Sequence, residues 1–194
     1  MNEEKKFFSK KNIMGMIIVF LMVFSVLGIW QGSSDALPKY NGLKVTQNDN
    51  QYSIKTDKGI ITGYVYPSYL EYISLDTTMP AYIFVEYSPS IVVLFDPTDK
   101  ALSYIEVLRM ELAQQLPLLG KTVSYGITQV NETYSYPVVN CSSTTPVIFL
   151  KTSAATNTSH IYGEENCLVL EAESKEDLIS LRDRLLYTLF GVMN

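Results

Sequence analysis

Residues able to do chemistry are scarce in this chain, and a pair of aspartates is the first candidate. Asp96 and Asp99 follow the apolar run 91–95. Open α/β sheets bind ligands beyond the carboxyl ends of buried strands, where carboxylates can hold a divalent cation. The order Asp-Pro-Thr-Asp also fits a helix start, with a capping oxygen, a proline at the first helical position and a carboxylate near the exposed amides. Capping explains both aspartates without a ligand, so they are weak ligand candidates, and we predict no metal and no cofactor.

Acid–base catalysis has little support in the sequence. His160 is the only histidine, it lies in a small polar stretch, and no serine stands in a G-x-S-x-G turn. The ten glycines are scattered singly and form no phosphate-binding motif. We interpret His160 as an exposed loop residue and expect a protein that is not an enzyme. In an enzyme of unidentified class, Asp96, Asp99 and His160 would be the residues to replace first.

The two cysteines, Cys141 and Cys167, predict a disulfide. A metal site is the alternative, but it would need two further ligands, and only one histidine exists. Each cysteine begins or flanks a short apolar run, and we expect those runs to be neighbouring strands. The bridge would then hold the loop 151–166 against the core that the terminal helix covers. It requires Cα atoms about 4.4–6.8 Å apart.

Three N-x-S/T sequons occur near the cysteines, at Asn131, Asn140 and Asn157. The polar stretch 152–159 around the third is typical of an exposed loop. These asparagines are candidate glycosylation sites if the domain lies outside the cytoplasm.

An uncharged apolar run over residues 13–30 predicts a transmembrane helix. As a helix it would be about 27 Å long, which suits the hydrocarbon core of a thin bilayer, and Trp30 would lie at the far interface. The lysines before it predict a cytoplasmic tail, residues 1–12, by the positive-inside rule. Residues 31–39 then form a stalk and 40–194 one extracytoplasmic domain. A cleaved signal peptide with a site near Ala36 is the alternative, but the run is longer than the usual 7–15 residues of such peptides.

Charge separates the two sides of this predicted span. The first twelve residues carry four lysines and two glutamates, whereas residues 31–194 carry 11 basic and 18 acidic residues, a net charge of −7. An acidic domain repels phosphate backbones, so we expect no nucleic acid among its partners.

The domain opens with a predicted antiparallel meander over residues 43–66, interrupted by turns at 48–50 and 57–59. Four tyrosines stand at or just after its end, Tyr64, Tyr66, Tyr69 and Tyr72. They could form a binding face, but packing on half-buried strands is the simpler interpretation.

The middle of the chain predicts a strand-helix-strand unit. Runs 81–87 and 91–95 are nearly continuous in apolar residues, as in strands covered on both faces. A helix with leucines at spacings of three and four follows from Pro97 to Leu116, and 123–128 gives a parallel strand.

Two further strands, 146–150 and 167–170, precede a terminal helix whose capping box begins at Ser174. We interpret Arg182, Asp183 and Arg184 on this helix as a solvated face. The whole pattern predicts an α+β domain with an α/β-like core, in which two amphipathic helices pack on a mixed β-sheet.

Short segments of the C-terminal third carry a family resemblance: Asn140-Cys141, Thr145-Pro146-Val147-Ile148, Glu165-Asn166-Cys167, Asp183-Arg184-Leu185-Leu186-Tyr187 and Gly191-Val192-Met193. In these the chain resembles a group of uncharacterised archaeal single-pass membrane-anchored proteins with a disulfide-bonded extracytoplasmic domain. The resemblance agrees with paired cysteines and implies no activity.

The sequence is therefore consistent with three hypotheses about function. The first is a module tethered to the cell membrane that binds a protein or another component of the envelope. The second is an accessory subunit of a membrane transport or secretion complex that assembles through its helix, in which Gly15 and Gly28 would let another helix approach. The third is an enzyme.

Overall fold

The computed structural model describes residues 16, 19, 22, 38–153 and 158–194. The chain divides into two units, residues 1–36 and 37–194, of which the second is a folded α+β domain. The predicted tail, most of the predicted membrane segment and most of the stalk lie outside the described residues. Within the described ranges, no helix has the length and apolar character needed to cross a bilayer. The segment 13–30 therefore stays a prediction.

The domain begins with the expected meander. Strands β1 (Val45–Asn48), β2 (Gln51–Thr56) and β3 (Gly59–Gly63) form a three-stranded antiparallel sheet. The first turn places Asp49 at a φ of 51° and the second begins β3 with Gly59 at 136°, where a glycine backbone is unstrained. One side chain from each strand, Val45, Ile54 and Ile61, points into the core.

Residues 81–87, expected as a buried strand, form a helix. A short 3₁₀ helix, η1 (Pro67–Leu70), leads into α2 (Pro80–Tyr87). A short apolar run fits a strand and a buried helix equally well, and proline at the first helical position decides for the helix. Only Ala81, Tyr82 and Val85 of α2 are buried, which is the spacing of one helical face.

The second sheet has five strands in the order β5-β4-β6-β8-β7. Its elements are β4 (Ser90–Phe95), α3 (Leu102–Gln115), a 3₁₀ turn η2 (Leu116–Leu119), β5 (Thr122–Ile127), β6 (Val147–Thr152), β7 (His160–Glu164) and β8 (Cys167–Ala172). All neighbours are parallel except β7, which pairs antiparallel with β8. The predicted parallel strand-helix-strand unit is thus confirmed as β4-α3-β5, while β7 falls in the stretch expected to be a loop.

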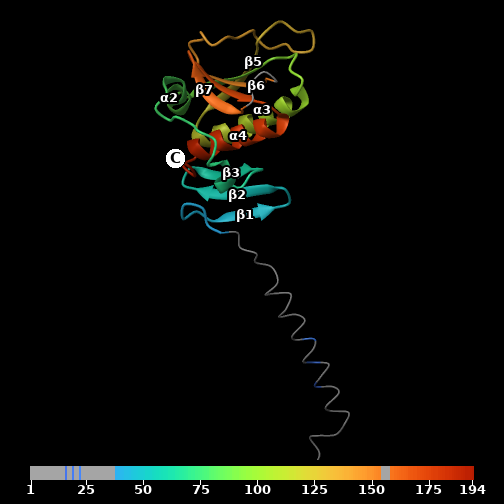
Figure 1. The fold of residues 1–194 in the computed structure, drawn as a ribbon, viewed down its shortest axis with the longest axis vertical. Helices are drawn as coiled ribbons and strands as arrows, with labels where there is room; N and C mark the ends of the chain where they lie inside the picture. The colour runs from blue at the N-terminus through green and yellow to red at the C-terminus, as the bar shows by residue number, and fades with distance from the viewer. Residues whose placement is uncertain (1–15, 17–18, 20–21, 23–37, 154–157) are drawn as a thin grey trace, which may run out of the picture. The chain divides into compact units, whose positions relative to one another are not determined.

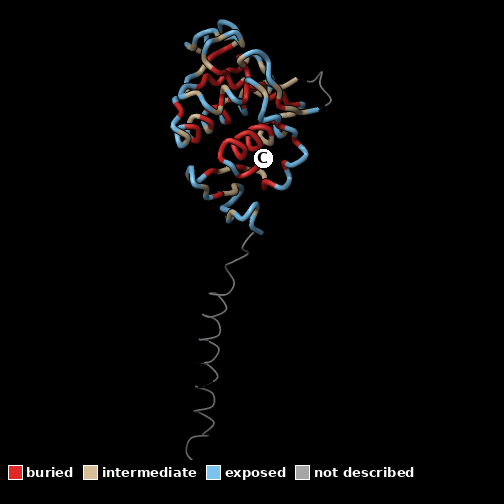
Figure 2. Tube along the Cα trace, turned by 90° about the vertical axis from the view of Figure 1, so that its left-hand side faces the viewer, coloured by how far each residue is buried: buried red, intermediate tan, exposed pale blue. Residues whose placement is uncertain are grey.

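Helix α4 (Lys175–Leu189) lies between the two sheets (Figure 1). Figure 2 shows the greater part of it buried at the centre of the domain, whereas its first two residues are exposed. It packs on β8 and β6 on one side and on β3 and η1 on the other. Helix α3 packs beside α4, and α2 packs on β7 and β8. The coarse prediction of an α+β fold is confirmed, but the single mixed sheet with two helices is replaced by two sheets with three helices, of which α4 lies between the sheets.

This placement makes the predicted solvated face of α4 wrong. Arg182, Asp183 and Arg184 are 1%, 0% and 5% exposed. Helix α4 is covered on both sides. The charged residues that would be exposed to solvent on a surface helix therefore face β3 and η1. Arg184 donates from Nε to the Ile73 carbonyl, at 3.0 Å, and from Nη2 to the carbonyl of Asn194, at 2.8 Å.

Asp183 joins α4 to the three-stranded sheet. Its Oδ2 accepts hydrogen bonds from the amides of Tyr64, at 2.6 Å, and Val65, at 2.9 Å. The Arg182 guanidinium donates to its Oδ1 and also to Glu111 of α3. Burial raises the pKa of the Asp183 carboxyl, and the Arg182 charge and the two amides oppose that rise.

The close approach of these layers requires a glycine. A Cβ on Gly63 would lie 2.3 Å from the Tyr187 hydroxyl and 2.9 Å from Oδ2 of Asp183. That hydroxyl donates to the Val65 carbonyl at 2.9 Å. The glycine therefore lets the end of β3 lie directly on the polar groups of α4.

Candidate functional site

A pocket of about 420 Å³ opens at the carboxyl ends of the parallel strands. Segments that follow β4, β6 and β8 form its walls, and it is lined by Asp96, Thr98, Asp99, Lys100, Ala101, Thr152, Glu173, Ser174 and Lys175. The chain leaves β4 toward β5 on one side, whereas β6 leads to β8 on the other. The pocket therefore lies at the point where the strand order reverses, which is where open α/β sheets bind ligands.

Asp96 organises the loop that leaves β4. Its Oδ1 accepts hydrogen bonds from the amide and the hydroxyl of Thr98, at 2.8 and 2.7 Å, and from Nε2 of Gln129, at 3.2 Å. Burial alone would raise the pKa of Asp96, but these hydrogen bonds outweigh it and hold the pKa below its ordinary value. The carboxylate is therefore ionised at neutral pH and already engaged within the loop.

Asp99 ties the same loop to the end of β6. Its carboxylate accepts from the Ala101 amide at 2.8 Å and from the amide and hydroxyl of Thr152, at 2.7 and 2.6 Å. Helix α3 begins at Leu102, with no side-chain cap on Ala101. The expectation that the helix begins at Pro97 is thus wrong, because both aspartates hold a turn before it.

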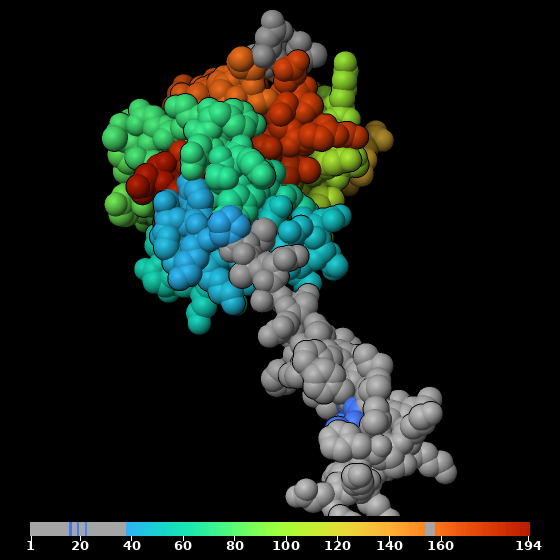
Figure 3. Space-filling model, turned by 60° about the horizontal axis from the view of Figure 1, so that its bottom comes forward, coloured from blue at the N-terminus to red at the C-terminus, as the bar shows by residue number. Residues whose placement is uncertain are grey.

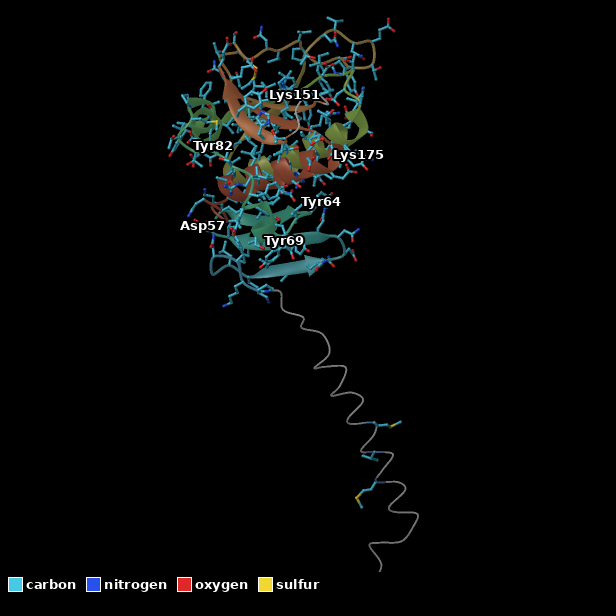
Figure 4. All side chains as sticks on the ribbon, viewed as in Figure 1. Asp57, Tyr64, Tyr69, Tyr82, Lys151 and Lys175 are labelled. Carbon is cyan, nitrogen blue, oxygen red and sulfur yellow. A yellow bond between two sulfur atoms is a disulfide. The ribbon has the colours of Figure 1, made fainter. Side chains whose placement is uncertain are left out.

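The opposite wall is the beginning of α4, where the predicted capping box is confirmed. Ser174 is the N-cap: its Oγ accepts from the Asp177 amide at 3.1 Å and donates to the Asp177 carboxylate at 2.8 Å. Lys175, labelled in Figure 4, lies with its Nζ 4.6 Å from the centre of the Tyr104 ring on α3. The first turns of α3 and α4 are therefore in contact beside the pocket.

Lys100 and Glu173 complete the rim with opposite charges. Both are exposed, one on each wall of the pocket. Neither was singled out from the sequence, because only the fold brings the loop after β4 opposite the loop after β8. In the described part of the chain, no three His, Cys, Asp or Glu side chains come together as metal ligands. The arrangement offers polar and charged contacts to a small ligand or to a peptide.

His160 does not join the two aspartates. It is the first residue of the edge strand β7 and not a loop residue, and β6 and β8 lie between it and β4. Its ring stacks on Tyr162 with centroids 4.9 Å apart, and its Nδ1 lies 3.0 Å from the Thr158 carbonyl. It lines a different pocket, beside Met79 and Pro80. The three residues named for an enzyme thus form no common site.

The disulfide between Cys141 and Cys167 is confirmed, with Cα atoms 5.0 Å apart. The expected neighbourhood of β6 and β8 is also confirmed. The bridge packs with Val147 and Val169 in a small cluster that is separate from the main core. That cluster lies on the sheet face opposite the helices, because side chains alternate along each strand. The expectation that the bridge meets the core covered by the terminal helix is therefore wrong.

Two of the three sequons are described, and both lie in the long connection between β5 and β6. Asn140 is exposed and Asn131 is half-buried, and each accepts a hydrogen bond from the amide two residues on. Asn157 lies outside the described residues. Glycosylation at the three asparagines stays a prediction.

Comparison with known protein families, with curated proteins and with solved structures finds no match. The resemblance to archaeal membrane-anchored proteins therefore stays a prediction.

Proposed function

We propose that the protein is a module of the cell envelope, anchored by residues 13–30, which binds a protein or another envelope component through its extracytoplasmic domain. The observation that carries the proposal is the state of the groups around the pocket. Asp96 accepts hydrogen bonds within its loop and Asp99 accepts them from the end of β6, while Lys100 and Glu173 remain exposed. Such a rim suits recognition, because it presents charges of both signs beside a pocket whose loops are held by hydrogen bonds.

The compartment is supported by the disulfide. Paired cysteines persist in oxidising compartments and are rare in the cytosol. The lysines before the predicted helix agree with the same orientation. The disulfide and the lysines support the extracytoplasmic location of the domain, and the pocket supports its role in binding.

Site-specific photo-crosslinking in intact cells tests the proposal. A photoreactive residue replaces Lys100 at the rim in the full chain, and the control replaces Lys55, which is also exposed and lies on β2 of the other sheet. We expect a discrete adduct from position 100 and none from position 55. Equal yields from both positions, or no adduct from either, would contradict a binding site at the pocket.

A further inference from the structure

Two tyrosines at one end of the domain have no role in its core. Tyr69 and Tyr72 are 70% and 73% exposed, whereas their neighbours Leu70 and Ile73 are buried. The Ile73 amide donates to the Leu70 carbonyl at 3.0 Å, which continues the i to i+3 bonding of η1. Side chains three residues apart point the same way in such a turn. The pair therefore forms one exposed aromatic surface, and the expectation that these tyrosines pack holds for the buried Tyr66 and the half-buried Tyr64 but not for Tyr69 and Tyr72.

This surface adjoins the point where the described chain enters the domain. The Tyr66 ring lies 6.0 Å from that of Tyr69, and its hydroxyl donates to the Pro38 carbonyl at 2.7 Å. Tyr40 donates to Glu71 at 3.1 Å. In Figure 3, the blue residues that follow Pro38 border the blue-green residues that follow β3. Tyr69, labelled in Figure 4, thus belongs to the end of the domain at which the chain enters.

Chain length restricts which surface can meet a membrane. Between a helix that ends at residue 30 and Pro38, residues 31–37 extend over at most about 25 Å. A domain of this size has a radius of gyration of about 15 Å and is therefore wider than the tether is long. Only the surface around Pro38 is then held within constant reach of the bilayer.

We propose that Tyr69 and Tyr72 dock the domain onto the headgroup region of the membrane that holds its anchor. This inference rests on the proposed function, because it needs the anchor. A tyrosine ring has an apolar body and a polar tip, and it is enriched at membrane interfaces. Lys39 and Lys44 are exposed in the same N-terminal stretch and suit lipid phosphates, while Tyr40 engages the nearby Glu71.

Tryptophan fluorescence in the full chain, reconstituted in vesicles of phosphatidylcholine and phosphatidylglycerol, tests the docking. Lipids brominated high on the acyl chain quench tryptophans near the headgroups. Trp30, the only tryptophan, reports on the anchor in the wild-type chain. In a Trp30→Phe background, Tyr72→Trp reports on the proposed surface. Val130→Trp is the control, because Val130 is 86% exposed and follows β5, on the far side of the helical layer.

We expect quenching of Trp30 and of the Tyr72→Trp reporter to similar extents, with the Val130→Trp reporter as bright as in unbrominated vesicles. If Trp30 is quenched but Tyr72→Trp is no dimmer than Val130→Trp, the docking is wrong and the anchor stands. If Trp30 itself is not quenched, the anchor of the proposed function fails, and the docking fails with it. The Tyr72→Trp emission could instead be blue-shifted without bromine quenching, to an extent that depends on protein concentration. That result would show that a second copy of the chain covers the surface, and it would contradict docking onto lipid.

Discussion

Replacing Asp183 with alanine should remove much of the stability of the domain. The change takes away the acceptor of the Tyr64 and Val65 amides, and a buried donor left unpaired costs about 1–3 kcal/mol. It also deprives the buried Arg182 of one of its two carboxylate partners. Breaking a buried ion pair from one side costs about 3–5 kcal/mol, so we expect a loss in that range.

That loss is large against the stability of an ordinary domain, which is about 5–15 kcal/mol. The matched control is Glu176→Ala, which removes a carboxylate from the same helix at a side chain that is 68% exposed. Surface changes of this kind stay within about 0.5 kcal/mol. Equilibrium denaturation of residues 38–194, kept oxidised, gives both free energies of unfolding.

The melting temperature gives a second measurement of the stability that Asp183→Ala removes. One kcal/mol lowers the melting temperature of a domain of this size by about 2–4 °C, so Asp183→Ala should lower it by about 6–20 °C. If Asp183→Ala and Glu176→Ala unfold with the same free energy, Asp183 does not hold the layers together.

Three further changes test the same architecture. Burial raises the pKa of Asp183, so the stability of the wild-type chain relative to Asp183→Asn should fall as pH rises from the unfolded-state pKa to the native pKa, while the Arg182 pair and the two amide hydrogen bonds persist above it; denaturation titrations of both chains measure this, and a relative gain on raising pH would reverse the sign of the shift. Gly63→Ala should cost about 1–3 kcal/mol, since its Cβ would overlap the Tyr187 hydroxyl, and unchanged stability would show that the layers separate easily. Replacing Cys141 and Cys167 together by serine should cost about 3.5 kcal/mol for a loop of 26 residues, and a melting temperature that is the same with and without reductant would contradict this.

Sequence patterns predict those helices, strands and turns that are marked by the residues within them and beside them. The meander and the cap at Ser174 depend on residues close in sequence, and the parallel pair of β4 and β5 follows from the helix pattern between the two strands. The disulfide also follows from composition, because two cysteines in one predicted extracytoplasmic domain leave few alternatives.

The errors have a common cause in tertiary packing. Periodicity shows that α4 has an apolar face, but it does not show that a second sheet covers the opposite face and buries Arg182 and Asp183. The run 81–87 was ambiguous between strand and helix, and the signal that decides it is Pro80.

The candidate site was predictable in part. Asp96 and Asp99 were placed correctly at the carboxyl end of a buried strand, but their role as loop organisers depends on Thr152 from another strand. Lys100 and Glu173 carry no signal in the sequence. They become a rim only when β4 and β8 end at the same edge of the sheet.

We propose that the folded domain lies outside the cytoplasm on a membrane anchor. Labelling of single introduced cysteines with a membrane-impermeant maleimide tests it most directly, since the native pair is bridged and does not react. The account predicts that Val130→Cys, at a side chain 86% exposed in the domain, is labelled in intact cells, whereas Lys5→Cys is labelled only after the membrane is opened. Labelling of Lys5→Cys in intact cells, with Val130→Cys protected until lysis, would contradict it.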